Sequence, residues 1–257
     1  MEMRILAIGD VVGEPGLRHL EKWLRRVQSQ YKVDFTVVNG ENADGVGLKP
    51  DQAWRIYDAG ADVVTLGNHT FGRMQITDLL DDARWILRPA NYTGRAPGRG
   101  CGVYDWNGLR IRVVNLIGRC DLEWKADNPF VVVDRLLERE QADVTLVDFH
   151  AEATSEKLAM KYYLDGRAAA VWGTHTHVPT ADEQIMPKGT GYISDLGMTG
   201  PIHSVLGIRP EQSIEGFLGG IPGRYQTADG KCKMQGVIFD LDSATGLCVG
   251  VERVDIR

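Results

Sequence analysis

The sequence contains few cysteines and no long apolar run. The four cysteines are far apart and form no C-x-x-C motif, so a disulfide framework is not expected: Cys101, Cys120, Cys232 and Cys248. Free thiols are typical of cytoplasmic proteins. No apolar stretch reaches the ~18 residues that a spanning helix needs, and the N-terminus reaches Asp10 too early for a signal peptide. We therefore expect a cytoplasmic protein with no membrane partner.

Positive charge is also scarce. The 257 residues include 29 Lys and Arg against 35 Asp and Glu, which gives a formal net charge of −6. Because non-specific nucleic-acid binding needs a basic surface, we expect no stable nucleic-acid partner. If the chain handles a phosphate group, the compensating positive charge must come from another source.

Short apolar, β-branched runs alternate with helical patterns along most of the chain, which is typical of βαβ units. Helices are expected over residues 15–31 and, capped by Thr154 or Ser155, over residues 156–164. Strands are expected over residues 4–8, 35–39, 62–66, 85–87, 111–116, 143–149, 168–172 and 191–194. Residues 198–230, rich in Gly and Pro, predict a long ordered excursion, and residues 233–242 and 247–256 predict a hairpin that completes a sheet. We expect one α/β domain over residues 1–257.

Polar residues of the kinds that bind metals follow five of the predicted strands. In open α/β sheets, sites form at the carboxyl ends of the strands, so these residues are expected to converge. Taken singly, Asp10 and Asn42 are explained as turn formers, His150 as a core histidine and His69 as a helix cap. The coincidence of four of the six histidines at strand ends favours a shared metal site that draws on Asp10, Glu41, Asn42, Asn68, His69, His150, His175 and His177.

The stretch "WGTHTHVPTAD" places His175 and His177 one residue apart after a predicted buried strand. In an extended backbone residues i and i+2 share a face, so both imidazoles are expected to point at one metal site. Two surface histidines that lie close by chance are the alternative.

The donor set indicates which metals fit. Three imidazoles with carboxylate and amide oxygens are too many ligands for a closed tetrahedral zinc site. Mixed nitrogen and oxygen donors suit iron, manganese or zinc, and a carboxylate such as Glu41 can bridge two ions. Two divalent ions about 3.5–4 Å apart can hold a phosphate and ionise a water that attacks phosphorus. These ions would supply the positive charge that the chain lacks.

Taken together, "GDVVG", "NGEN", "GNHTFG", "DFHAEATSEK" and "GTHTHVPTAD" resemble the motifs of the calcineurin-like metallophosphoesterases. The resemblance runs from residue 4 to about residue 200 and is specific to the YmdB-type bacterial branch, known as 2′,3′-cyclic-nucleotide phosphodiesterases. It implies a four-layer sandwich of two mixed β-sheets flanked by helices. The superfamily's usual D-x-H is absent, because Val11 and Val12 follow Asp10, and its usual G-D is replaced by "NGEN" with Glu41.

The resemblance also implies roles for the site residues. Asp10, Glu41, Asn42 and His177 would hold one ion. Glu41, Asn68, His150 and His175 would hold the other, with Glu41 bridging. The family usually binds iron or manganese, so we expect iron, with manganese as the alternative and zinc less favoured. His69 is then free to protonate the departing ribose oxygen or to hold the phosphate.

The expected function is hydrolysis of small cyclic nucleotides by attack of a metal-bound hydroxide on phosphorus. The expected substrates are 2′,3′-cyclic nucleotides, and activity on 3′,5′-cyclic nucleotides stays open. Three alternatives stay open: a catalytically weak regulatory or scaffold protein of the same fold, a broad-specificity phosphatase, and an amidohydrolase-like enzyme. The last usually carries H-x-H after its first strand, whereas here the motif follows residue 170. Whether the chain forms a homo-oligomer also stays open. Trp54 and Trp124 are candidates for an interface, and the alternative is that they pack in the core.

Overall fold

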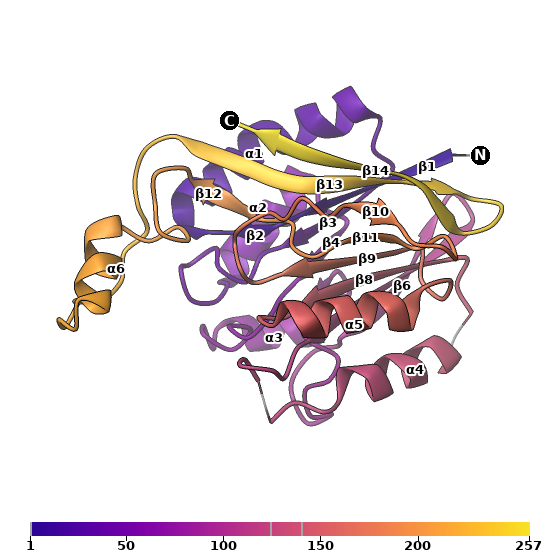
Figure 1. Cartoon of the computed structure of the whole chain (residues 1–257), viewed down its shortest axis with the longest axis horizontal. Coiled ribbons are helices and arrows are strands. Elements are labelled where there is room, and N and C mark those ends of the chain that lie inside the picture. Colours follow the sequence, from indigo (N-terminus) through magenta and orange to yellow (C-terminus); the bar gives the residue numbers. More distant parts are fainter. Residues whose placement is uncertain (1, 124, 140) are drawn as a thin grey trace.

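The structure, a computed structural model, describes residues 2–123, 125–139 and 141–257 (Figure 1). Its first sheet, sheet A, has the strand order β2-β12-β13-β1-β3-β4-β5, with β14 paired to β13. Strands β1, β3, β4 and β5 are parallel, and β13 is antiparallel to β1, β12 and β14. The strands are β1 (Glu2–Ile8), β2 (Asp10–Val11), β3 (Phe35–Asn39), β4 (Val63–Thr65), β5 (Ile86–Leu87), β12 (Met198–Pro201), β13 (Cys232–Asp242) and β14 (Leu247–Ile256).

The second sheet, sheet B, has the strand order β10-β11-β9-β8-β7-β6. Its four central strands are parallel, and an antiparallel strand lies at each edge. Both sheets are therefore mixed, as the family resemblance implied. The strands are β6 (Cys101–Trp106), β7 (Leu109–Ile117), β8 (Val144–His150), β9 (Ala170–Thr174), β10 (Gln184–Ile185) and β11 (Gly191–Ile193).

Helices cover the outer faces of both sheets. One apolar cluster packs α1 (Gly13–Tyr31), α2 (Pro50–Ala59) and α3 (Ile76–Asp82) on sheet A. Another packs α4 (Pro129–Arg139) and α5 (Thr154–Leu164) on sheet B. A third cluster lies between the sheets, where Ile5 and Phe239 of sheet A share a core with Val113 and Trp172 of sheet B. These four layers confirm the predicted sandwich.

Helix α1 shows why the sequence folds in this way. Its apolar residues recur every three or four positions and are buried, whereas the basic residues between them are exposed. Burial of such a stripe against a sheet is the main source of stability for a helix of this kind. The buried residues are Leu17, Leu20, Leu24 and Val27, and the exposed ones are Arg18, Lys22, Arg25 and Arg26.

One prediction of detail differs from the structure. Helix α5 begins at Thr154 itself with Ala153 as its N-cap and no side-chain cap bond, so the predicted caps, Thr154 and Ser155, are wrong. The excursion predicted over residues 198–230 contains two regular elements, β12 and α6 (Pro210–Phe217). Strand β12 lies within sheet A, and α6 stands away from both sheets (Figure 1). The C-terminal hairpin, β13 with β14, is as predicted.

The interface candidates have different outcomes. Trp54 is 45% exposed and lies 5.0 Å, between ring centroids, from Trp85, within a surface aromatic cluster that includes Tyr57. Trp124 lies outside the described residues.

No helix in the described ranges is long and apolar enough to cross a membrane. The single domain over residues 1–257 stays a prediction.

Candidate metal centre

The predicted site residues lie at the carboxyl ends of parallel strands from both sheets. Asp10 is in β2, directly after β1. Glu41 and Asn42 follow β3, and Asn68 and His69 follow β4. On sheet B, His150 is the last residue of β8, and His175 and His177 follow β9. The ends of these strands meet at one edge of the sandwich, which brings residues from distant parts of the chain together.

His150 lies at the middle of this group. Its Nε2 atom is 3.0 Å from Oε1 of Glu41 and 2.9 Å from Oδ1 of Asn68. The same atom is 3.1 Å from Nδ1 of His175. One imidazole nitrogen cannot make three hydrogen bonds, because it carries either a single proton or a single lone pair. Several nitrogen and oxygen atoms with lone pairs therefore lie close to one point, as the ligand atoms of a bound cation do.

Asp10 lies on the other side of the group. Its Oδ2 accepts a hydrogen bond from the backbone N–H of His175 at 3.1 Å. Its Oδ1 is 3.7 Å from Nε2 of His177 and, although buried, has no hydrogen-bond partner among the described residues. Asn42 links the two halves, since its Nδ2 is 3.1 Å from Nε2 of His177 and 3.2 Å from Oε1 of Glu41.

His69 is half-buried at the rim of the group. Its backbone N–H donates to Oε2 of Glu41 at 3.1 Å. Its ring Nε2 is 3.3 Å from Nδ2 of Asn68. An amide nitrogen only donates, so Nε2 accepts and the proton of the neutral ring is on Nδ1. All eight predicted residues thus belong to one network of contacts of at most 3.7 Å.

Burial and charge oppose each other here. Burial acts to raise the pKa of Asp10 and of Glu41, but the nearby imidazoles lower both pKa values below their ordinary range. Burial acts to lower the pKa of His150, yet the charges of Glu41 and Asp10 outweigh it and raise that pKa to about 9. His175 is shifted the other way, because burial and the positive charge of His150 lower its pKa to about 4. The two buried carboxylates therefore create a field that favours cations.

The backbone of the H-x-H segment is not extended. His175 has a φ of 99° and His177 a φ of 63°, so the expectation that they share one face of a strand is wrong. Both rings reach the group through left-handed turns beyond the end of β9, a conformation that costs free energy in non-glycine residues. Hydrogen bonds offset this cost: Nδ1 of His177 donates to the carbonyl of Leu206 at 2.9 Å, and Asp195 accepts from the N–H of Thr176 at 3.2 Å.

A buried polar layer beneath the site was not predicted. Nδ1 of His150 lies 2.9 Å from the hydroxyl of Thr174, which donates to Asp148 at 2.7 Å. The hydroxyl of Thr65 donates to the other oxygen of Asp148 at 2.5 Å, and Asn39 lies 3.5 Å from the same oxygen. The signal in the sequence was a polar residue near the end of each of β3, β4, β8 and β9, within runs that are otherwise apolar.

Two further residues were missed. Oε2 of Glu152, which follows β8, lies 3.0 Å from Nε2 of His175. Gly67 precedes Asn68, and a Cβ atom at this position would lie 2.3 Å from the ring of His150 and 2.4 Å from Glu41. Only glycine leaves space for both side chains, which explains why a glycine precedes Asn68 and His69 in "GNH".

The residues present fit a divalent metal. The donors are imidazole nitrogens and carboxylate and amide oxygens, the mixture that suits iron, manganese or zinc. Donor atoms of Glu41, His150 and His175 lie within 4.8 Å of one another. The unpartnered Oδ1 of Asp10, fully buried, is a ligand atom that only a cation or a proton donor would satisfy.

Comparisons with known proteins identify the family of this chain. A sequence model of the family described as YmdB-like protein matches residues 6–254. This chain belongs to the YmdB-like family. The 2′,3′-cyclic-nucleotide 2′-phosphodiesterase of Bacillus subtilis (strain 168) is 45% identical to it over 258 residues, which cover 99% of this chain and 97% of that protein.

Solved structures that are similar to this chain have the same fold. A hypothetical protein from Thermus thermophilus is 41% identical with a TM-score of 0.92, and the match covers 99% of each chain. A phosphatase from Mycoplasma pneumoniae is 35% identical with a TM-score of 0.94, and the match covers 100% of this chain and 94% of that one. The resemblance to the metallophosphoesterases, the fold and the enzyme class, a phosphodiesterase-type hydrolase, are confirmed.

Proposed function

We propose that this chain hydrolyses small 2′,3′-cyclic nucleotides at a dinuclear metal centre. The observation that carries the proposal is the single contact network of strand-end residues, which contains a buried carboxylate oxygen without a partner. The Bacillus subtilis relative, whose name is that of a 2′,3′-cyclic-nucleotide 2′-phosphodiesterase, supports the substrate class. The eight residues are Asp10, Glu41, Asn42, Asn68, His69, His150, His175 and His177.

The contacts divide the ligands into two groups that share Glu41. On one side Asp10, Asn42 and His177 lie together, and on the other His150, His175 and Asn68 do. Glu41 touches both groups, through Asn42 and through His150, which supports its role as a bridge. When bound, two ions supply Lewis-acid stabilisation of the phosphate and an activated water. We propose iron, with manganese as the alternative and zinc less favoured.

His69 is the proposed general acid. As an imidazolium its ring can donate the Nε2 proton to the ribose oxygen that leaves phosphorus, and the neutral ring that remains, with its proton on Nδ1, then accepts from Nδ2 of Asn68. The half-buried position of His69 would let its ring reach a substrate whose phosphate is held by the ions. Without a donor an alkoxide must leave, which is a poor leaving group.

The test compares His69→Ala with the wild type on two substrates. With 2′,3′-cyclic AMP we expect kcat to fall roughly 10²–10⁴-fold, the usual contribution of a general acid. With bis-p-nitrophenyl phosphate, whose phenolate leaves without a proton, the loss should be much smaller. Metal content, measured by elemental analysis, should not change.

The control variant is His203→Ala, which removes an exposed histidine outside the site and should change neither rate. Unchanged turnover of 2′,3′-cyclic AMP in His69→Ala with full metal content would show that His69 is not the acid. Inclusion of 3′,5′-cyclic AMP, phosphomonoesters and a simple amide in the same assay tests the wider and the alternative activities directly.

The remaining expectations belong to this proposal. The substrate is a small molecule and no stable nucleic-acid partner is needed, because the net charge is −6. A cytoplasmic location is supported by the absence of a disulfide among the described residues. A homo-oligomer stays a prediction that light scattering would test.

A further inference from the structure

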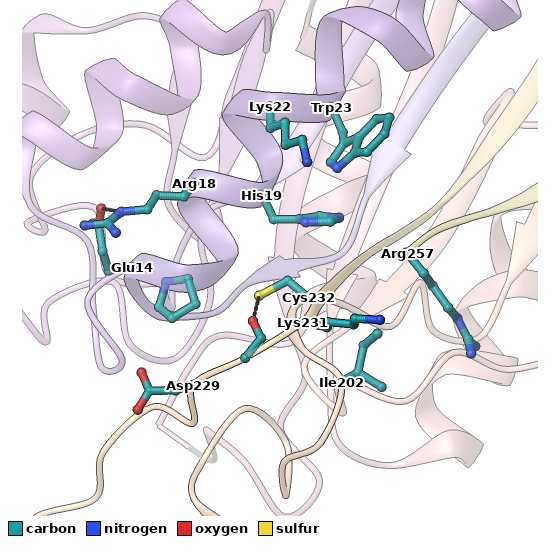
Figure 2. Close-up of a pocket in the computed structure, with 12 residues that line it drawn as sticks. Glu14, Arg18, His19, Lys22, Trp23, Ile202, Asp229, Lys231, Cys232 and Arg257 are labelled. Atoms are coloured by element: carbon teal, nitrogen blue, oxygen red, sulfur yellow. Dashed lines mark hydrogen bonds and ion pairs between the residues drawn. The ribbon is translucent and has the colours of Figure 1, made fainter.

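A groove of about 860 Å³ lies between α1 and the edge of sheet A formed by β12, β13 and β14 (Figure 2). Successive turns of α1 provide one wall, with Arg18, His19, Lys22 and Trp23. The other wall is formed by Ile202, Lys231 and Arg257, which lie next to the ends of β12, β13 and β14, and the backbone N–H of Ile202 donates to the carbonyl of Lys231 at 2.9 Å. None of the eight residues of the metal centre lines this groove, so it is a separate feature of the surface.

The groove has a local surplus of positive charge, although the whole chain is acidic. Its two acids are already paired: Glu14 with Arg18 and Arg55, and Asp229 with Arg209. Arg257 is paired with Asp255. In contrast, neither lysine of the groove has a carboxylate within 4.0 Å among the described residues, and Figure 2 shows Lys22 on the α1 wall and Lys231 on the opposite wall, where its side chain runs toward Ile202 and Arg257. Two uncompensated ammonium groups on facing walls suit a dianion.

The same groove offers an aromatic wall. Trp23 is half-buried, its ring lies 6.2 Å from that of His19 between centroids, and Nζ of Lys22 is 4.9 Å from its ring centre. Nε2 of His19 is 3.3 Å from the carbonyl of Ile256, which only accepts, so Nε2 carries the proton. Burial lowers the pKa of His19, so the ring is neutral near pH 7 and its Nδ1 is an acceptor. The wall therefore combines a flat aromatic ring, over which Lys22 and Arg26 also lie, with one hydrogen-bond acceptor.

We propose that this groove is a second, non-catalytic binding site for a free nucleoside monophosphate. Lys22 and Lys231 would bind the phosphate from the two walls, Trp23 would stack on the base, and Nδ1 of His19 would accept from a base amine or a ribose hydroxyl. A ligand that joins a dianion to a flat heteroaromatic ring matches all three features, and a volume of about 860 Å³ holds one nucleotide but not a long polymer. The inference does not rest on hydrolysis at the metal centre.

The test is calorimetric titration of the metal-loaded enzyme with the methylenephosphonate analogue of AMP, whose carbon–phosphorus bond resists hydrolysis. We expect binding at the groove in addition to any binding at the metal centre. The double variant Lys22→Ala/Lys231→Ala should weaken the groove binding roughly tenfold or more, because charge-assisted contacts to phosphate are lost. Trp23→Ala should reduce it by roughly tenfold through lost stacking, while Trp23→Phe should retain most of it.

The matched control is Arg95→Ala/Lys188→Ala, which removes two exposed positive charges elsewhere and should leave the titration unchanged. Inorganic phosphate should compete weakly and adenosine more weakly still. All variants should keep the wild-type kcat on bis-p-nitrophenyl phosphate, so a failure of the groove proposal is distinguishable from a failure of the proposed function. Equal binding by the lysine variant and the wild type, or binding by the wild type at the metal centre alone, would overturn the inference.

Discussion

Nε2 of His150 lies 3.0 Å from Oε1 of Glu41, and both side chains are fully buried. Glu41 follows β3 of sheet A, and His150 ends β8 of sheet B, so this contact joins the two sheets at the carboxyl ends of their strands. The site is therefore part of the interface between the sheets, and its geometry depends on how the sandwich packs.

The first prediction concerns the hydroxyl of Thr174. It accepts from Nδ1 of His150 and donates to Asp148, so it fixes the ring with its proton on Nδ1 and leaves Nε2 for a metal. In Thr174→Val the shape is kept but the hydroxyl is lost. We expect metal affinity or activity to fall roughly 10–100-fold, as is usual when the partner of a metal-binding histidine is removed. Metal titration followed by kcat measurements would show it.

The control for this prediction is Thr174→Ser, which keeps the hydroxyl and removes a methyl group. It should stay close to the wild type in metal affinity. If the serine variant is as impaired as the valine variant, packing of the methyl group matters and the hydrogen-bonded role is wrong.

The second prediction tests the space at Gly67. In Gly67→Ala the new Cβ would meet the ring of His150 at 2.3 Å and Oε2 of Glu41 at 2.4 Å, so both side chains must move. We expect loss of metal binding and activity, with a loss of stability of about 1–3 kcal/mol, typical of overpacking. Gly94→Ala is the matched control, because a Cβ there would have nothing within 4 Å. Wild-type metal content in Gly67→Ala would contradict the geometry of the site.

Much of the site was predictable because strand ends are a simple geometric feature. Parallel strands bring their carboxyl ends to one edge, so Asp10, Glu41 and His150 could be placed together from the sequence. The left-handed turns at His175 and His177 could not be foreseen, since they depend on hydrogen bonds to Asp10 and Leu206 from distant segments.

Other features were hidden for different reasons. Asn39, Thr65 and Asp148 are polar residues in strands, and only tertiary structure shows that they share one buried layer. Helix α6 stands away from both sheets (Figure 1). Its own sequence does not predict this position, because the place of a helix relative to the sheets depends on tertiary contacts. The walls of the groove beside α1 come from opposite ends of the chain, so spacing along the sequence gave no sign of it.

The third prediction concerns metal removal. A metal that binds only the folded state stabilises it by about 2.7 kcal/mol when present at ~100 times its dissociation constant. For a chain of this length we therefore expect a chelator to lower Tm by roughly 5–10 °C in calorimetry. Iron or manganese added back should restore the wild-type Tm. An unchanged Tm after elemental analysis has verified metal removal would contradict a site that bridges both sheets.

The fourth prediction concerns a buried ion pair beside the H-x-H segment. Nζ of Lys157 lies 2.8 Å from Oδ2 of Asp195, and the two side chains are only 3% and 2% exposed. Asp195 also accepts from the N–H groups of Thr176 and Gly197, so it holds the turn between the two histidines. Lys157→Met leaves this carboxylate buried without its cation, and we expect a loss of about 3–5 kcal/mol in the free energy of unfolding.

Urea denaturation measures this loss, and the exposed Lys188→Met is its control, with an expected change within about 0.5 kcal/mol. In the double variant Lys157→Met/Asp195→Asn the uncompensated charge is gone while the amide oxygen can still accept from Thr176. This variant should therefore recover part of the stability that Lys157→Met loses. If both variants are equally unstable, the cost comes from lost packing of the lysine stem, and charge compensation does not hold the turn in place.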